Sequence, residues 1–211
     1  MNHEVKTCAV VGNAPNILEN EYGESIDSHD VIIRCNRSFV EGFEKHVGSK
    51  TTFRIINCHT FFEFTHKRVP DFNKVFSTIE TKKLNEIIAP DEIILLKDDL
   101  NYPDGLVART SHIEKLLKEQ WEMDNNVCSI NLGQITHRNG LRFNASAGAV
   151  AIAFCRSCFP QAQVDCYGFS FYQESKDCSH YYESVAPKEL GHDYDSEREI
   201  LLNMNKVDFI Q

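Results

Sequence analysis

Short apolar runs alternate with longer amphipathic segments along the chain. The runs are rich in β-branched and aromatic residues and end at turn-forming residues, which is typical of β-strands. Six runs are predicted to be strands: residues 7–12, 30–35, 51–57, 74–80, 92–96 and 163–169. Residues 110–123 and 146–159 have the length and spacing of helices. The alternation predicts an α/β fold with a mostly parallel sheet flanked by helices on both faces, in a Rossmann-like layout.

Two strand-to-helix turns are candidate ligand sites, because open α/β sheets bind ligands beyond the carboxyl ends of their strands. Gly12 and Asn13 follow the first strand without forming a G-x-G-x-x-G dinucleotide fingerprint. Gly12 would let a ligand approach the backbone, and Asn13 is either a ligand contact or a turn former. Ser146 is expected to cap the helix that follows it, and Gly148 to permit close approach of an anion. A purely structural cap is the alternative.

Two histidines, His180 and His192, lie in a polar stretch near the end of the chain. Ser196 and Glu199 have the spacing of a capping box, which predicts a helix beginning there. His192 would then lie in a loop ahead of the helix, where an imidazole is more often functional than part of a core.

Composition limits the class of protein. The 211 residues are 42% hydrophobic and contain no linker or repeat, so we expect one domain over residues 1–211. The net charge of −9 leaves no basic surface for a nucleic acid. No run of about 18 apolar residues occurs, and an apolar strand follows the N-terminus directly, so neither a membrane anchor nor a signal peptide is expected and the chain should be soluble.

The eight cysteines lie mostly in apolar runs, so we expect buried thiols rather than a disulfide scaffold. Cys155 and Cys158 form a C-x-x-C, but no second pair follows at zinc-finger spacing. The pair is therefore not enough to indicate a zinc or redox site.

Four segments resemble the sialylmotifs of glycosyltransferase family 29, the sialyltransferases, and they follow one another along the chain in the order of the family. Residues 8–52 resemble the large motif, with "YGESIDSHD", "RCN" and "GFEKHVGSKTT". Residues 144–172 are similar to the small motif, "HYYE" at 180–183 to the third, and "HDYDSE" at 192–197 to the very short motif H-x-x-x-x-E. They cover about half of the chain, and the region from Cys58 to Arg142 matches no motif. The resemblance implies a variant of the GT-A type fold.

The resemblance also implies a donor and roles for individual residues. Asn13 and Asn36 would contact the nucleotide of a CMP-activated sugar, and the turn Ser146, Ala147 and Gly148 its carboxylate or phosphate. His180, aided by the hydroxyl of Tyr181 or its neighbour Tyr182, would stabilise the leaving phosphate. His192 would be the general base that deprotonates the acceptor hydroxyl, with inversion at the anomeric carbon.

The chemistry of the residue types agrees with these roles. Attack on an oxocarbenium-like carbon needs a base that is neutral near pH 7, as an imidazole is. A departing phosphate gains charge, which a hydrogen-bond donor stabilises. Asp193 and Asp195 resemble a metal-binding D-x-D, but acidic residues are also favourable at a helix N-terminus. We therefore expect no cofactor and no metal, and assign Glu197 only a supporting role.

Three departures from the family pattern affect these expectations. Ala14, Ala145 and Ala147 replace the usual Ser, Pro and Ser or Thr, so donor binding would depend more on backbone N–H groups. In the family a cysteine of the large motif pairs with one of the small motif. For Cys8 the partner that the resemblance implies is Cys158, ahead of Cys155 and Cys166.

The expected partners are a CMP-sugar donor and a glycan acceptor. The alternatives are transfer of another CMP-activated ulosonic acid such as Kdo, a catalytically inactive CMP-sugar-binding module, and a metal-dependent transferase. Without an anchor, and with Met1 at its start, the chain is expected to be cytoplasmic; a trimmed domain of the Golgi lumen is the alternative. The acceptor, the linkage and the oligomeric state do not follow from the sequence.

Overall fold

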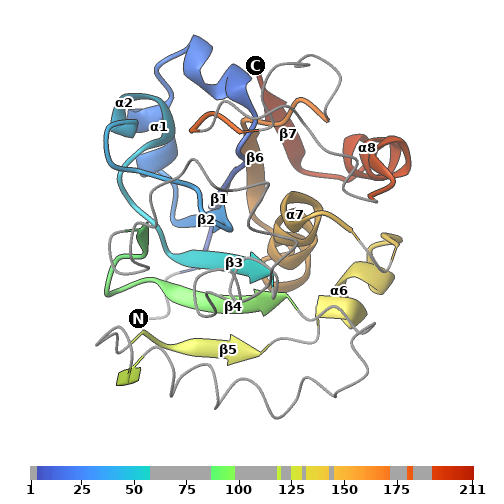
Figure 1. The fold of residues 1–211 in the computed structure, drawn as a ribbon. Coiled ribbons are helices and arrows are strands. Elements are labelled where there is room, and N and C mark those ends of the chain that lie inside the picture. Colours follow the sequence, from blue (N-terminus) through green and yellow to red (C-terminus); the bar gives the residue numbers. More distant parts are fainter. Residues whose placement is uncertain are drawn as a thin grey trace, which may run out of the picture.

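A computed structural model describes residues 4–57, 87–97, 118–119, 125–129, 132–142, 145–171, 180–182 and 192–211. Their strands form one seven-stranded sheet, in the order β5-β4-β3-β2-β1-β6-β7 (Figure 1). Every pair of neighbours is parallel. The strands are β1 Thr7–Val11, β2 Val31–Cys35, β3 Phe53–Asn57, β4 Ile93–Lys97, β5 Val127–Ser129, β6 Gln163–Tyr167 and β7 Val207–Ile210. The predicted α/β class is confirmed.

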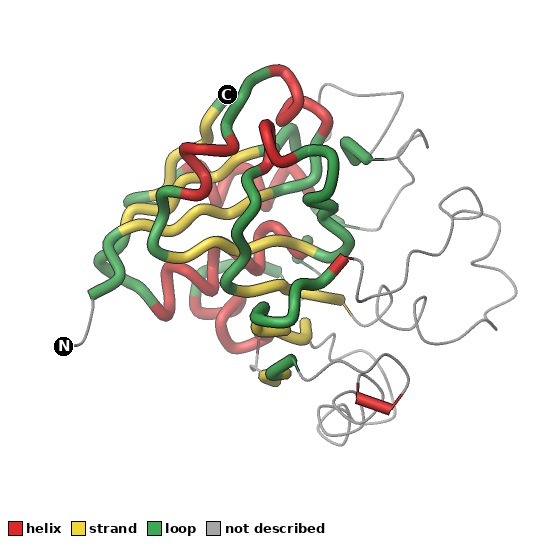
Figure 2. The backbone as a smooth tube through the Cα atoms, turned by 90° about the vertical axis from the view of Figure 1, so that its left-hand side faces the viewer, coloured by secondary structure: helices red, strands yellow, loops and turns green. Residues whose placement is uncertain are grey.

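The helices cover both faces of the sheet, which forms the middle layer in Figure 2. Helix α7 packs against β1, β2, β3 and β6. The α-helices are α1 Gly23–Asp27, α2 Glu44–Val47, α6 Leu132–Arg138, α7 Ala147–Cys158 and α8 Tyr194–Leu202, and η1 Pro15–Glu19 is a 3₁₀ turn.

Residues 8–11 of β1 are all apolar because both faces of the strand are covered. Cys8 and Val10 pack into the core that contains α7, whereas Ala9 and Val11 pack with Ile17 of η1 on the opposite face. Because side chains alternate between the faces of a strand, a strand covered on both faces needs apolar residues at every position.

Most of the predicted elements agree with the structure. Five of the six strands are present, with ends shifted by one or two residues, and the sixth, 74–80, lies outside the described residues. The helix predicted at 110–123 also lies outside them, apart from residues 118–119, which are helical. Strands β5 and β7 and the helices α1, α2 and α6 are short, and the sequence analysis did not predict them.

The strand order places a topological switch point at β1. The chain proceeds from β1 to β5 in one direction across the sheet and then returns to place β6 on the other side of β1. Ligands of open α/β sheets bind at the carboxyl edge beside such a point. The site is therefore expected where β1 and β6 end, at Val11 and Tyr167.

Candidate functional site

Three loops meet tightly at the switch point. The amide of Gly12 donates to the Tyr167 carbonyl at 2.7 Å. A Cβ on Gly12 would lie 2.3 Å from the Gly168 oxygen, and one on Gly148 would lie 2.7 Å from the Phe169 ring. The space that these two glycines leave is thus filled by Gly168 and Phe169, so packing requires both glycines, and the approach of a ligand to their backbone stays a prediction.

Phe169 lies between these loops and was given no role by the sequence analysis. Its ring is 3.0 Å from the Cβ position of Gly12 and 2.7 Å from that of Gly148, so it joins the end of β1 to the start of α7. The ring also packs on Phe209 of β7, with centroids 5.6 Å apart. Phe169 lies within residues 144–172, which resemble the small motif, but only the fold shows what its side chain contacts.

Asn13 connects three segments of the carboxyl edge. Its Nδ2 donates to the Cys35 carbonyl at 3.1 Å, and its own carbonyl accepts from the Tyr181 amide at 2.9 Å. Its Oδ1 is buried and has no hydrogen-bond partner among the described residues. A buried acceptor without a donor is costly, so this atom is suited to a ligand hydroxyl or amino group.

Asn36 follows β2 in a left-handed conformation, with φ of 52°. Its Oδ1 accepts from the Asn57 amide at 3.0 Å, and its carbonyl accepts from Arg54. Asparagine tolerates this conformation better than most residues. The side chain therefore ties the ends of β2 and β3 together, whatever further contact it makes.

The third-motif segment sends one tyrosine into the core. Tyr181 is 7% exposed, and its hydroxyl donates to the Phe39 carbonyl. Burial raises the pKa of this phenol, which keeps it protonated as a donor. Tyr181 therefore has a structural role, and the donor contact that the resemblance implies stays a prediction. His180 and Tyr182 are half-buried, with rings stacked at 5.2 Å.

Ser146 caps α7 as predicted, and its hydroxyl accepts from the Ala149 amide at 3.2 Å. The unpredicted partner is Glu197. Its carboxylate, on a residue that is 5% exposed, accepts from the Ser146 amide at 2.8 Å and from the Ser146 hydroxyl at 2.6 Å. This Ser146–Glu197 bridge connects the small motif to the very short motif across 51 positions.

The start of α8 differs from the prediction. The cap is Asp193, which accepts from the Ser196 amide at 3.2 Å and from its hydroxyl at 2.9 Å, so the proposed Ser196 and Glu199 capping box is wrong. Asp193 also forms an ion pair with Arg142, and these hydrogen bonds lower the pKa of its carboxyl group. Asp193 is therefore engaged within the protein and not simply available to a metal.

His192 lies directly before this cap, as predicted, in the loop that leads into α8. The residue is half-buried, and its ring meets that of Tyr194 at 5.5 Å. Because the next residue is fixed by the cap and by Arg142, the backbone that carries the imidazole is held at the N-terminus of the helix.

The structure joins the predicted residues in two groups. Asn13 belongs with the His180–Tyr182 segment, and Ser146 with the α8 segment that His192 precedes. Phe169, in contact with the positions of Gly12 and Gly148, connects the two groups. The amides of Ala147 and Gly148 open the helix α7 and have no partner in the described part of the chain, as expected in a first turn.

The preferred partner of Cys8 also changes. The Cys8 thiol is hydrogen-bonded to Cys155, and both are fully buried, whereas Cys158 is exposed. The bond that Cys155 donates lowers the pKa of Cys8. The order of preference that put Cys158 first is therefore wrong, because the face of α7 that meets β1 presents Cys155.

Residues 1–101 match the model of glycosyltransferase family 29 (sialyltransferase). CMP-N-acetylneuraminate-beta-galactosamide-alpha-2,3-sialyltransferase 1 of Sus scrofa is 37% identical over 40% of this chain and 27% of its own length. Beta-1,6-galactosyltransferase GALT29A of Arabidopsis thaliana is 51% identical over 24% of this chain and 13% of its own. The chain thus spans about a quarter or less of these relatives.

A crystal structure of a mammalian sialyltransferase in complex with Gal-beta-1-3GalNAc-ortho-nitrophenol has the same fold. It aligns with a TM-score of 0.60 over 98% of this chain and 69% of its own, at 23% identity. The described residues contain no helix long and apolar enough to cross a membrane.

The prediction of a cytoplasmic protein is wrong, because the sialyltransferase relatives are Golgi-resident enzymes that act in the lumen of the secretory pathway. Over residues 1–101, slightly less than half of the chain, the protein is therefore similar to glycosyltransferase family 29, and over nearly its whole length it shares the fold of the mammalian enzyme.

Proposed function

We propose that the chain is an inverting glycosyltransferase that moves sialic acid from CMP-sialic acid to a hydroxyl group of a glycan. The observation that carries this proposal is the meeting of the large, small, third and very short motif segments at one carboxyl edge. Asn13 bonds to Tyr181 there, and Ser146 bonds to Glu197. Segments that are far apart in the sequence are thus joined where parallel sheets bind ligands.

The donor would bind between the end of β1 and the start of α7. The unpaired Oδ1 of Asn13 can accept a hydrogen bond from a hydroxyl or amino group of the nucleotide. The Ala147 and Gly148 amides, at the positive end of a 12-residue helix, can bind an anionic group. Ala147 offers no hydroxyl, so this contact would rest on the backbone.

Glu197 acts in this proposal as a positioning residue. Its carboxylate takes the amide and hydroxyl of Ser146, which fixes the cap and leaves the next two amides to the donor. The same side chain belongs to α8, so it also sets the distance between the α7 N-terminus and His192.

The chemical step would use the two histidines. His192 takes the proton of the acceptor hydroxyl as its oxygen attacks the anomeric carbon, and the bond to the CMP phosphate breaks on the opposite face. His180, stacked on Tyr182, donates a hydrogen bond to the phosphate as its negative charge grows. The products are CMP and a sialylated glycan with inverted anomeric configuration.

The test is a donor comparison with Galβ1-3GalNAc as acceptor, monitored by CMP release and product mass. We expect turnover of CMP-sialic acid, little with CMP-Kdo, and none with a nucleotide-activated galactose, which the name of the Arabidopsis relative makes a necessary control. EDTA should not change the rate, since Asp193 already caps α8. Turnover of CMP-Kdo alone, or CMP binding without any transfer, would contradict the proposal.

A further inference from the structure

Helix α8 is attached to the rest of the protein along one stripe of its surface. Leu201, near its end, is 1% exposed and belongs to the core, and Glu197, near its middle, bonds to Ser146. Asp193, which caps its start, pairs with Arg142. The three residues of the stripe are four positions apart, so they lie on one face of the helix. The pair with Arg142 is the attachment at the start of this stripe.

Arg142 has a fixed backbone, although its side chain is 67% exposed. Its carbonyl accepts from the Ala145 amide at 3.1 Å, in the turn that leads into α7. The preceding residue, Leu141, is 5% exposed and belongs to the same core, and its amide donates to the Thr136 carbonyl of α6 at 2.9 Å. The backbone that carries the guanidinium is therefore held on both sides, and the ion pair has to order only the side chain.

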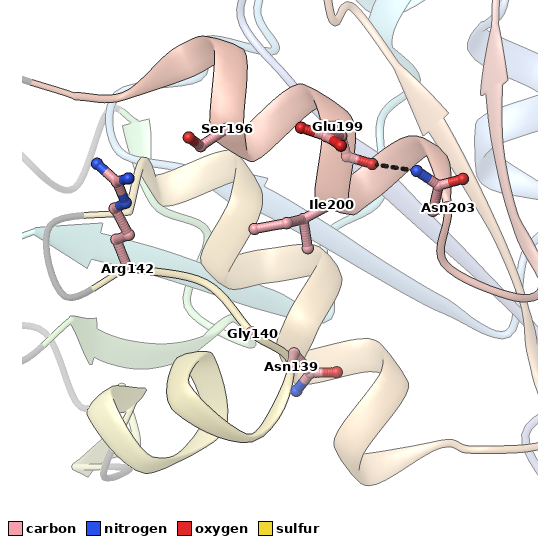
Figure 3. A pocket seen from close by; sticks show the side chains of 7 residues that line it. All are labelled: Asn139, Gly140, Arg142, Ser196, Glu199, Ile200 and Asn203. Carbon is pink, nitrogen blue, oxygen red and sulfur yellow. Dashed lines mark hydrogen bonds between the residues drawn. The ribbon is translucent and has the colours of Figure 1, made fainter.

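A shallow groove separates α8 from the segment that joins α6 to α7 (Figure 3). It is lined by Asn139, Gly140, Arg142, Ser196, Glu199, Ile200 and Asn203. Figure 3 shows Arg142 and Ser196 at one end of this groove, beside the start of α8. Because the groove is not filled by side chains, packing along it contributes little to the position of the helix on this side.

The first turn of α8 is the part of the helix that depends on polar contacts for its position. Glu197 and Leu201 hold the residues that follow it, and the cap formed by Asp193 and Ser196 lies within the turn itself. The ends of helices fray. Fraying here would move the residue directly after His192, and a displacement of about 1 Å near a reacting group can lower a rate by about 10²-fold.

We propose that Arg142 is a positioning residue for the proposed base. Its guanidinium holds Asp193, and thereby the loop that carries His192, against the segment that leads into α7. The proposal rests on the proposed function, which gives His192 its role. Because the ion pair is exposed, it contributes little to the stability of the whole protein. Its effect is therefore expected in kcat and not in the melting temperature.

The test uses variants that remove the ion pair from either side. Arg142→Ala removes the cation, and Asp193→Asn removes the carboxylate but keeps a residue that caps helices well. Arg142→Lys keeps the positive charge on a different head group. Arg138→Ala, at an exposed position in the last turn of α6, removes the same charge away from the pair and is the matched control.

Arg142→Ala should lower kcat about fivefold, the ratio that an exposed ion pair of about 1 kcal/mol gives, and leave the KM of donor and acceptor unchanged. Asp193→Asn should have the same effect, and the double variant should lower kcat no further, because all three lose one interaction. Arg142→Lys should restore part of the rate, and Arg138→Ala should leave it unchanged. A raised KM with unchanged kcat in Arg142→Ala would make Arg142 a substrate contact and overturn the positioning role, as would additive effects on kcat.

Hydrogen exchange separates failure of this proposal from failure of the proposed function. The amides of Ser196 and Glu197 donate to Asp193, so their exchange, followed by NMR, reports on the first turn of α8 without any transfer. Both should exchange about fivefold faster in Arg142→Ala and at the wild-type rate in Arg138→Ala. Faster exchange in a chain that transfers no sugar contradicts the proposed function and retains the hold of Arg142 on α8. Unchanged exchange in Arg142→Ala overturns that hold, whether or not transfer occurs.

Discussion

The large-motif region, residues 8–52, and the helix-end region, which comprises Ser146 at the start of α7 and residues 192–197 at the start of α8, differ in the roles of their residues. In the large-motif region, the charged side chain of Arg34 holds the fold together. Arg34 is fully buried, and its guanidinium donates to the Thr51 hydroxyl and to the carbonyls of Val47, Gly48 and Lys50. Burial lowers the pKa of Arg34 to about 10, which still leaves a cation at neutral pH.

In the helix-end region, Ser146, His192 and Asp193 are half-buried. Ser146, Glu197 and Asp193 hold the starts of α7 and α8, and His192 and the first amides of α7 stay beside them. A long recognisable motif therefore marks where the chain must bury charge and fix loops. The short motifs mark where reactive groups are presented.

The largest effect should come from the helix-end region. His192→Ala should reduce transfer by about 10²–10⁴-fold, the usual contribution of a general base. The half-buried ring lies in a loop, so the melting temperature and CMP affinity should hardly change. Initial rates measure transfer, a CMP titration measures the affinity, and thermal unfolding measures the melting temperature. Substantial transfer by this variant would place the base elsewhere.

The second effect tests the scaffold side of the comparison. Arg54 and Glu92 form a buried ion pair at 2.6 Å and are 0% and 3% exposed. Glu92→Gln removes one charge and should lower the free energy of unfolding by about 3–5 kcal/mol. Urea unfolding measures this loss.

The Arg54→Met/Glu92→Leu double variant controls for the unpaired charge and should recover much of the stability. A single variant as stable as the wild-type chain would show that the pair is not needed. Donor KM should be measured alongside stability, since Arg54 also donates to the carbonyl of Asn36.

The third prediction concerns the Ser146–Glu197 bridge, which fixes the fold and lies beside the proposed donor site. Glu197→Gln keeps the shape of the side chain and removes the charge that holds the Ser146 amide and hydroxyl. We expect donor KM to rise about tenfold, as for one charge-assisted hydrogen bond of about 1.5–3 kcal/mol partly replaced by the amide.

Ser146→Ala should produce a similar change, and the double variant little more than either alone, because both remove one interaction. Additive effects on donor KM would mean that the two residues act separately. A loss of stability with unchanged kinetics would make the bridge purely structural.

The sequence predicted those features that neighbouring residues determine. The apolar runs located five strands, and the serine before an apolar segment located the cap of α7. The cap of α8 was misplaced by three residues because Asp193 and Ser196 are both good caps, and local spacing cannot choose between them.

Features that depend on distant partners could not be predicted. Glu197 meets Ser146 from 51 positions away, and Glu92 meets Arg54 from 38 positions away. The burial of the motif residue Tyr181 against Phe39 likewise arises from a partner 142 positions away. Periodicity predicts which face of a helix or strand is apolar, but it does not predict which distant residue will form an ion pair or hydrogen bond with a given side chain.

The smallest effect should come from an exposed part of the scaffold, at Asp27. Its carboxylate accepts from the Ser49 and Lys50 amides at 2.9 Å and from the Ser49 hydroxyl at 2.7 Å. Partial burial opposes the charged form, but these bonds outweigh it and lower the pKa of Asp27.

A carboxyl group whose pKa is lowered by folding stabilises the protein above its unfolded value of about 3.9, and this contribution is lost as the pH falls through the folded value. Asp27→Asn should therefore cost about 1 kcal/mol or less at pH 7, because solvent screens the site, and should make the free energy of unfolding less dependent on pH below about 4. Glu24→Gln, on the same helix and exposed, is the control. Urea unfolding between neutral and acid pH measures both variants. An Asp27→Asn variant with the wild-type pH dependence would show that the loop after α2 is held by the fold around Arg34 and not by this carboxylate.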